Sequence, residues 1–111
     1  MKAPRGQNFL YQPQWQRRVA DAIVAPGTQV ERLVEIGGGP GGLSELLAAR
    51  ARRLWVIEND RALAEGLRRR FAGRDWVVVV EQNVLAVDFR ALADPGRLDV
   101  AGNLPYYITS P

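Results

Sequence analysis

The stretch VEIGGGPGGLS, residues 34–44, decides the fold of this chain. A mostly apolar run, residues 33–36, leads into a loop of glycines, and apolar residues at helical spacing resume at Leu43, Leu46 and Leu47. This order is that of a strand, a tight turn and a helix N-terminus, as in the first βα unit of a nucleotide-binding α/β sheet. Glycine suits the turn because it adopts backbone angles closed to other residues and lets a ligand lie directly on the main chain.

The glycine spacing leaves two classes of cofactor open. Gly37, Gly39 and Gly42 fit the G-x-G-x-x-G pattern of dinucleotide-binding proteins. Gly37, Gly39 and Gly41 fit equally well the G-x-G-x-G pattern common in S-adenosylmethionine (SAM) enzymes. A third interpretation is a purely structural turn. Residues elsewhere in the chain must therefore decide between them.

Composition excludes several kinds of site. The 111 residues are 47% hydrophobic and 24% charged, which indicates one soluble globular domain or part of one. No cysteine or histidine is present, which excludes a disulfide framework, a thiolate metal site and a histidine-based triad. The net charge is +3, and Lys2 is the only lysine. Arginine favours contacts with phosphates and base planes, so nucleic acid is a permissible partner.

The chain carries no sign of a membrane segment or a secretory leader. No apolar run approaches the roughly 20 residues needed to span a bilayer. Residues 1–6, MKAPRG, lack the apolar core of a signal peptide. We therefore expect a cytoplasmic protein with no membrane partner.

Apolar runs alternate with segments of helical spacing along the chain. The runs expected to be strands are residues 32–36, 53–58, 76–80 and 98–102. Helices are expected from Pro13 to the Ala25-Pro26-Gly27 stop, over about 42–51, and from the Asp60 cap to Gly73, with a loop or short helix over 86–96. Strands that alternate with helices predict a parallel sheet with right-handed crossovers.

The apolar spacing predicts which side chains of two helices and one strand are buried in the core. The buried face of the first helix is expected at Trp15, Val19, Ile23 and Ala22, and that of the helix after Asp60 at Leu63, Leu67 and Phe71. The run 76–80 is continuous and rich in valine, so this strand is expected to be buried on both faces.

Ligands of such sheets bind beyond the carboxyl ends of the strands, and four consecutive strand ends here carry candidate residues. They are the glycine-rich loop, Glu58, Asn83 and the segment Asn103–Tyr106. Glu58 lies 21 residues after Gly37, about where an acidic side chain accepts both ribose hydroxyls. The alternative without a ligand-binding role is that Glu58 is a solvated carboxylate at the start of a helix.

The segment Asn103-Leu104-Pro105-Tyr106 fits the [Asp/Asn]-x-Pro-[Tyr/Phe] pattern of enzymes that methylate an exocyclic amino group. An adenine N6 amine is a poor nucleophile because its lone pair is delocalised into the ring. The side-chain oxygen of Asn103 can accept an amine N–H, which favours a pyramidal nitrogen. Pro105 stiffens the loop and Tyr106 offers a ring on which a flipped-out base can stack. An ordinary Asn-x-Pro turn is the alternative.

Four motifs together resemble the small-subunit ribosomal RNA adenine N6,N6-dimethyltransferase family. They are Gly6-Gln7-Asn8-Phe9-Leu10, residues 35–44, Glu58-Asn59-Asp60 and residues 103–111. Their order and spacing match across roughly residues 5–111. The resemblance implies an α/β, Rossmann-like SAM-methyltransferase fold with sheet order 3-2-1-4. It also implies dimethylation of two adjacent adenosines in the small-subunit RNA.

The same resemblance implies roles for individual residues. Gln7, Asn8 and Leu10 are expected to close over the methionine end of SAM, with Gly37 and Gly39 beneath the cofactor and Glu58 on its ribose. Asn103, Leu104, Pro105 and Tyr106 are expected to hold the target adenine, and Asn103 is also assigned to the cofactor site. No metal is expected. Methyl transfer is expected to be a direct displacement at the sulfonium methyl that depends on positioning.

Two departures from the family pattern have consequences. Asn83 stands where the family usually has an aspartate beside the cofactor adenine, so its amide oxygen would accept the adenine amino proton without charge and bind more weakly. Family members also continue past Pro111 with further strands and a small helical domain. Residues 1–111 are therefore expected to be the N-terminal part of the methyltransferase domain, truncated after strand four. The exposed edge of that strand, about 97–101, predicts self-association.

Three alternatives stay open. The chain can be a truncated SAM-binding module without turnover, or belong with the macrolide-resistance methyltransferases of large-subunit RNA, which share these motifs. A nicotinamide-dependent oxidoreductase is supported by the G-x-G-x-x-G spacing alone.

Several arginines can supply phosphate contacts with RNA, although most of them are expected to be solvated side chains on helix faces. These arginines are residues 17, 18, 50, 52, 53 and 68–70.

Overall fold

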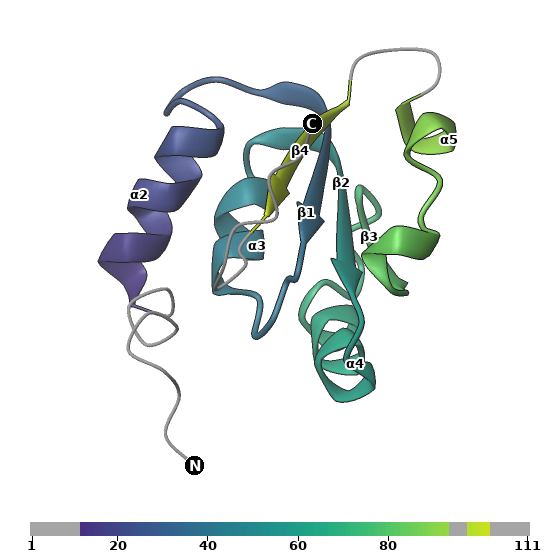
Figure 1. The fold of residues 1–111 in the computed structure, drawn as a ribbon. Coiled ribbons are helices and arrows are strands. Elements are labelled where there is room, and N and C mark those ends of the chain that lie inside the picture. Colours follow the sequence, from purple (N-terminus) through teal and green to yellow (C-terminus); the bar gives the residue numbers. More distant parts are fainter. Residues whose placement is uncertain (1–11, 94–97, 103–111) are drawn as a thin grey trace.

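The computed structural model describes residues 12–93 and 98–102 of the chain (Figure 1). Its helices are α2 (Pro13–Ile23), α3 (Gly42–Ala48), α4 (Arg61–Arg70), the 3-10 turn η1 (Val84–Ala86) and α5 (Phe89–Ala93). Its strands are β1 (Val30–Ile36), β2 (Ala51–Glu58), β3 (Val77–Glu81) and β4 (Asp99–Gly102). Within these described ranges, no helix is long and apolar enough to cross a membrane.

The four strands form one parallel sheet in the order β3-β2-β1-β4, which confirms the predicted topology (Figure 1). The register aligns the carboxyl ends of neighbouring strands. Ile36 of β1 pairs with Ile57 of β2 on one side and with Gly102 of β4 on the other. Glu58 pairs with Glu81 at the end of β3. The carboxyl ends of all four strands therefore lie at one edge of the sheet.

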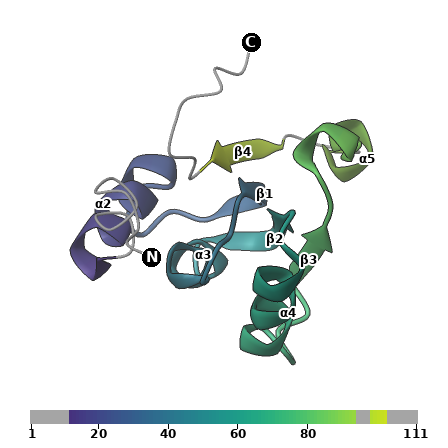
Figure 2. The ribbon, with the colours of Figure 1, turned by 60° about the horizontal axis from the view of Figure 1, so that its bottom comes forward.

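The hydrophobic core lies between one face of the sheet and the helices α2, α3 and α4. Figure 2 shows α3 and α4 together on the same side of the strands. Strand residues that alternate in sequence share this face, as expected for the two-residue period of a strand. The buried core residues are Ala20, Val24, Leu33, Leu43, Leu47, Ala48, Ala51, Leu54, Val56, Leu67, Phe71 and Ala101.

Two predicted helix faces are partly wrong. Leu63 is 38% exposed, and the buried residue at that level of α4 is Ala64. In α2 the most buried residue is Ala20, whereas Trp15 is 37% exposed and Ala22 is exposed. In both helices a small alanine faces the core where a larger apolar residue was expected. The spacing of apolar residues did not show which of these nearby helix positions faces the core.

The prediction that residues 76–80 are buried on both faces is also wrong. The four valines of β3 are all half-buried, and Trp76, which precedes the strand, is 39% exposed. The sheet order places β3 at an edge, so among the described strands only β2 is its neighbour. A continuous apolar run indicates a strand, but it does not say where in the sheet that strand lies.

The boundaries of α3 and β2 shift slightly from the expected ones. The helix ends at Ala48 rather than near residue 51, and β2 begins at Ala51 rather than residue 53. The pairing of Val30 with Ala51 extends the parallel ladder to this point, so sheet hydrogen bonding takes precedence over the helical pattern. The segment 86–96, expected to be a loop or short helix, begins at the last residue of η1 and contains α5.

Substitution of two glycines should have opposite effects on stability. A Cβ at Gly38 would lie 2.3 Å from Val56 Cγ1, whereas a Cβ on helical Gly66 would meet no atom within 4 Å. We expect Gly38→Ala to lower the free energy of unfolding by about 1–3 kcal/mol. Gly66→Ala should raise it by about 0.5–1 kcal/mol. Urea denaturation of both variants measures these changes, and equal shifts would contradict the packing of this loop.

Candidate cofactor-binding site

The glycine-rich loop, residues 37–41, turns the chain from β1 into α3. Gly37, Gly39 and Gly41 have φ angles of 78°, 56° and 100°, which side chains rarely permit. Gly37 N donates to Ile57 O at 2.7 Å, and Gly41 N donates to Gly38 O at 3.1 Å. Glycine at these positions is therefore required by the turn itself.

One side of the loop is packed and the other is open. A Cβ at Gly38 would contact Val56 and Leu67, and one at Gly41 would meet the Arg70 side chain at 2.7 Å. A Cβ at Gly39 would meet nothing within 4 Å. Among the described residues, the main chain at Gly39 thus borders open space, where a ligand can lie against the backbone.

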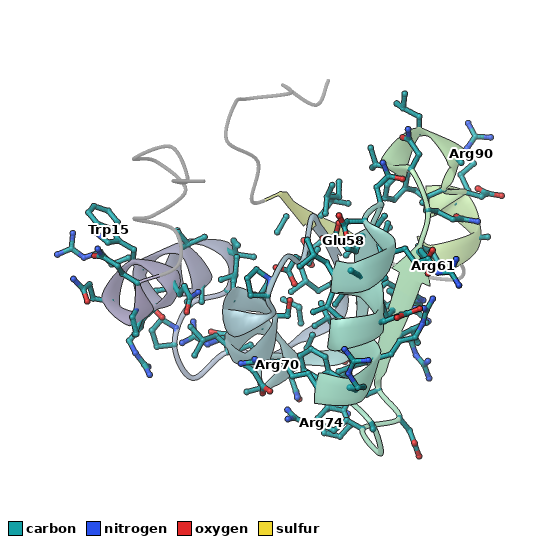
Figure 3. The ribbon with its side chains drawn as sticks, turned by 90° about the horizontal axis from the view of Figure 1, so that it is seen from below. Trp15, Glu58, Arg61, Arg70, Arg74 and Arg90 are labelled. Atoms are coloured by element: carbon teal, nitrogen blue, oxygen red, sulfur yellow. The ribbon has the colours of Figure 1, made fainter. Side chains whose placement is uncertain are left out.

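Glu58 ends β2 and joins that strand to the loop. Glu58 as a residue is 7% exposed; its Oε1 accepts from Gly39 N at 2.8 Å and its Oε2 accepts from Asp60 N at 2.9 Å. Figure 3, which views the molecule from below, shows Glu58 beside the first turn of α4. An ionised carboxylate has about four acceptor positions, so two remain for hydroxyl groups of a ligand. The structure brings Glu58 to the loop, as the sequence predicted.

Asp60 caps the N-terminus of α4, as predicted. Its side-chain oxygen accepts from Leu63 N at 2.9 Å at the start of α4. The same residue donates its backbone N–H to Glu58. The cap thereby fixes the Glu58 carboxylate relative to the helix as well as to the loop.

Asn83 lies two residues beyond the end of β3, the strand that pairs with the Glu58 strand β2. Its side-chain Oδ1 accepts from Leu85 N at 2.9 Å and caps the 3-10 turn η1. Leu85 is 91% exposed, which is unusual for a large apolar side chain so close to a candidate site. Leu85 was not among the residues predicted from the sequence, although an apolar residue two positions after a strand-end asparagine was a visible signal.

A second buried carboxyl group lies under the loop and was also missed. Glu35 on β1 is fully buried, and its Oε1 accepts from Ser44 Oγ of α3 at 2.5 Å. No described residue supplies a hydrogen bond to its Oε2. The pKa of Glu35 is raised to about 8, chiefly because the group is buried; the Ser44 hydrogen bond lowers the pKa in part, and the charge of Glu58 contributes to raising it. A glutamate inside the apolar run before the glycines was the available signal.

An arginine–glutamate cluster holds the two helices beside the loop together. Glu45 of α3 accepts from Arg70 at 3.1 Å and from Arg74 at 2.6 and 2.9 Å. Arg70 Nη1 also donates to Pro40 O at 3.5 Å. The hydrogen bond from Arg74 holds the pKa of Glu45 below its ordinary value. Figure 3 shows Arg70 and Arg74 towards the same end of α4, away from Glu58.

The other arginines divide into structural and exposed ones. Arg50 donates to Asp21 at 2.7 Å and to Val24 O at 2.9 Å, and it is largely buried, so its interpretation as a solvated or RNA-facing residue is wrong. Arg52 and Arg68 form exposed ion pairs, which contribute little to stability. RNA contact by the exposed arginines stays a prediction.

Seven of the predicted site residues lie outside the described residues. They are Gln7, Asn8, Leu10, Asn103, Leu104, Pro105 and Tyr106. Of the rest, Gly37, Gly39 and Glu58 form one connected unit, with Asn83 beyond the neighbouring strand. The described part of β4 ends at Gly102, the partner of Ile36 and so beside the start of the loop.

Comparison with known proteins decides the family. The family model for ribosomal RNA adenine dimethylase matches residues 1–111. The chain belongs to this family. Membership confirms the resemblance inferred from the four motifs.

Relatives and solved structures agree with this assignment. The ribosomal RNA small subunit methyltransferase A of Acidobacterium capsulatum is 52% identical over 110 residues, which are 98% of this chain and 38% of the relative. The chain thus spans about two fifths of the length of such relatives. The crystal structure of the 23S rRNA methyltransferase ErmE matches with a TM-score of 0.73 at 29% identity, covering 91% of this chain and 39% of ErmE.

A more distant structure supports the fold. A dimethyladenosine transferase from Plasmodium falciparum matches with a TM-score of 0.68 at 21% identity, covering 86% of this chain and 33% of that one. Together with the observed 3-2-1-4 sheet, these matches confirm the Rossmann-like methyltransferase fold.

The pH dependence of stability should identify Glu35. With a pKa near 8 in the folded chain and 4.5 as its reference value, Glu35 is protonated in the fold but ionised in the unfolded chain between these pH values. The free energy of unfolding should therefore fall as pH rises from about 5 to 8, by up to about 1.4 kcal/mol per pH unit from this group. Glu35→Gln should lack this loss.

Chemical denaturation at several pH values measures the effect. Glu31→Gln is the matched control, because Glu31 lies on the same strand with its side chain 71% exposed. It should keep the pH dependence of the parent chain. Identical pH profiles for the parent and Glu35→Gln would contradict the buried, protonated state.

Proposed function

We propose that this chain binds SAM on the glycine-rich loop and serves the N6,N6-dimethylation of two adjacent adenosines in small-subunit ribosomal RNA. The observation that carries the proposal is the hydrogen bond from Gly39 N to Glu58 Oε1 at 2.8 Å. It joins an open main-chain platform to a carboxylate with free acceptor positions. A nucleoside needs both: a backbone surface for close approach and an acceptor for its ribose hydroxyls.

Different residues at the carboxyl edge of the sheet would contact different portions of SAM. Glu58 would accept from the ribose hydroxyls while Asp60 N and Gly39 N keep its carboxylate in place. The exposed Leu85 side chain would give the adenine an apolar contact, with Asn83 beside it as a neutral hydrogen-bonding group. Gln7, Asn8 and Leu10 would close over the methionine end, as the family resemblance implies.

The target base would be held by the segment that follows β4. SAM supplies an electrophilic methyl group. Asn103 would accept an N–H of the adenine amine and favour a nitrogen lone pair aimed at that methyl. Leu104 and Pro105 would shape the loop, and Tyr106 would stack on the flipped base. Positioning of the base in this way is the contribution expected of the chain to catalysis.

Large-subunit RNA is the second candidate substrate. It is favoured by the similarity to ErmE, whose name specifies a 23S rRNA methyltransferase, at 29% identity. The curated relative from Acidobacterium capsulatum is more similar, at 52%, and its name specifies the small subunit. We therefore place small-subunit RNA first.

Removal of the charge at Glu58 should weaken cofactor binding. Hydrogen bonds to a charged group contribute about 1.5–3 kcal/mol, so Glu58→Gln should raise the dissociation constant for SAM roughly 10- to 100-fold. Isothermal titration calorimetry measures this change. Glu81→Gln is the matched control, because Glu81 is the register partner of Glu58 and pairs with Arg68 on the exposed side. Equal affinities for the two variants would contradict the ribose role.

Transfer of labelled methyl groups to RNA tests the activity itself. We expect the chain, incubated with labelled SAM and small ribosomal subunits, to yield N6,N6-dimethyladenosine detectable by mass spectrometry. Asn103→Ala should reduce the product at least about 100-fold, the size of effect typical of losing a group that positions or stabilises the reacting atoms. SAM binding without product on either RNA would favour a cofactor-binding module, and product on large-subunit RNA alone would favour the second candidate.

We also propose self-association along the outer edge of β4. Among the described strands, β1 is its only neighbour, and Val100 is 53% exposed. An unpaired apolar strand edge is a template for pairing with another chain. Light scattering of the concentrated chain should detect oligomers, whereas a monodisperse monomer would rule this out.

A further inference from the structure

Glu35 lies directly beneath the proposed cofactor platform and has no part in the function described so far. It precedes Gly37 by two residues on β1. Its hydrogen-bond partner, Ser44 Oγ, lies 3.4 Å from the position that a Cβ of Gly38 would take. The series Glu35, Ser44 and Gly38 therefore connects a buried carboxyl group to the underside of the loop.

The surroundings of Glu35 suit a neutral carboxyl group. A buried carboxylate needs donors at both oxygens, yet the described residues supply only Ser44 Oγ, and Oε2 has no partner. Loss of a proton at this site would leave a charge in a region with little solvent. The protonated form carries no net charge, so an unpartnered Oε2 costs less free energy in that form than in a carboxylate.

The charges around Glu35 point the same way. From β2, the Glu58 carboxylate opposes ionisation; from α3, the facing polar group is Ser44. Leu67 of α4 and Ala20 of α2 are apolar core residues on this side of the sheet. Within the described part of the chain, no ion pair joins a cation to Glu35. Residues 12–93 and 98–102 therefore supply no ion pair that would balance an ionised Glu35.

A bound cofactor would change this balance. SAM carries a sulfonium and an α-ammonium group, so it is a cation near neutral pH. A cation held against the glycine-rich loop acts on a buried carboxyl group through a medium of low dielectric constant, where electrostatic interactions are stronger than in water. Such a charge favours the ionised form of Glu35 and opposes the effect of Glu58.

We propose that binding of SAM to the glycine-rich loop releases a proton from Glu35 to the solvent, which makes Glu35 a positioning residue that couples cofactor affinity to pH. The inference rests on the proposed SAM site. In the free chain the neutral carboxyl group supports the loop through Ser44. In the bound chain the carboxylate offers a fixed negative charge beneath the positive cofactor. Affinity for SAM should then rise with pH while Glu35 is still protonated in the free chain.

Proton release can be counted by calorimetry. SAM is titrated into the 111-residue chain at pH 6.5 in two buffers with different ionisation enthalpies. At this pH the α-amino group of SAM is already protonated, since such groups titrate near 7.7–8.0. We expect the parent chain to release about one more proton per SAM than Glu35→Gln does. Its dissociation constant should also fall up to about tenfold per pH unit between pH 6 and 7, the limit for one linked proton.

Glu31→Gln is the control for the loss of a carboxylate on β1, and it should release as many protons as the parent chain. SAM binding with equal proton release in the parent and in Glu35→Gln would overturn the coupling and leave the proposed SAM site intact. Failure of the folded parent chain to bind SAM at any pH would overturn both.

A second measurement applies if Glu35→Gln does not fold. The carboxyl ¹³C resonance of Glu35 can be titrated in the parent chain with and without SAM. We expect a midpoint near pH 8 in the free chain and a midpoint at least about one pH unit lower when SAM is bound. An unchanged midpoint, or an ordinary midpoint near 4.5 in the free chain, would overturn the proposal.

Discussion

The fold depends on close contact between the glycine-rich loop and the layer beneath it. The loop must turn from β1 into α3 while its underside rests on Val56 of β2 and Leu67 of α4. No Cβ fits at Gly38, and three further glycines adopt positive φ angles. This steric constraint brings the loop close enough to β2 for Gly39 N to reach Glu58. The candidate site is thus a direct consequence of backbone packing.

Electrostatic interactions divide between the two sides of this loop. On the outer side, Glu45 binds Arg70 and Arg74 and ties α3 to the end of α4. On the inner side, the charge of Glu58 opposes ionisation of the buried Glu35. A protein that needed stability alone would gain from a neutral residue at Glu35. A carboxyl group that would ionise beneath a cationic ligand is a physical reason for a glutamate at this position.

Much of this arrangement could be predicted from the sequence because it depends on local periodicity and on fixed strand ends. The strands, the Asp60 cap and the place of Glu58 followed from apolar spacing and from the rule that parallel strands end at one edge. Predictions failed where a position depended on distant neighbours. Leu63 is exposed and β3 is half-buried because the helix contact stripe and the sheet edge are set by packing partners.

The sequence by itself determined the family, the parallel topology and the glycines of the turn, since these depend on local backbone chemistry and on motif order. Only the tertiary structure decided what each charged side chain does. Arg50 is a largely buried partner of Asp21, and Glu35 is a buried group that accepts a hydrogen bond from Ser44. Their partners lie on other elements, and the energy of a charge depends on its solvent exposure and its neighbours in space. Neither the solvent exposure of a charge nor its neighbours in space can be read from the local sequence.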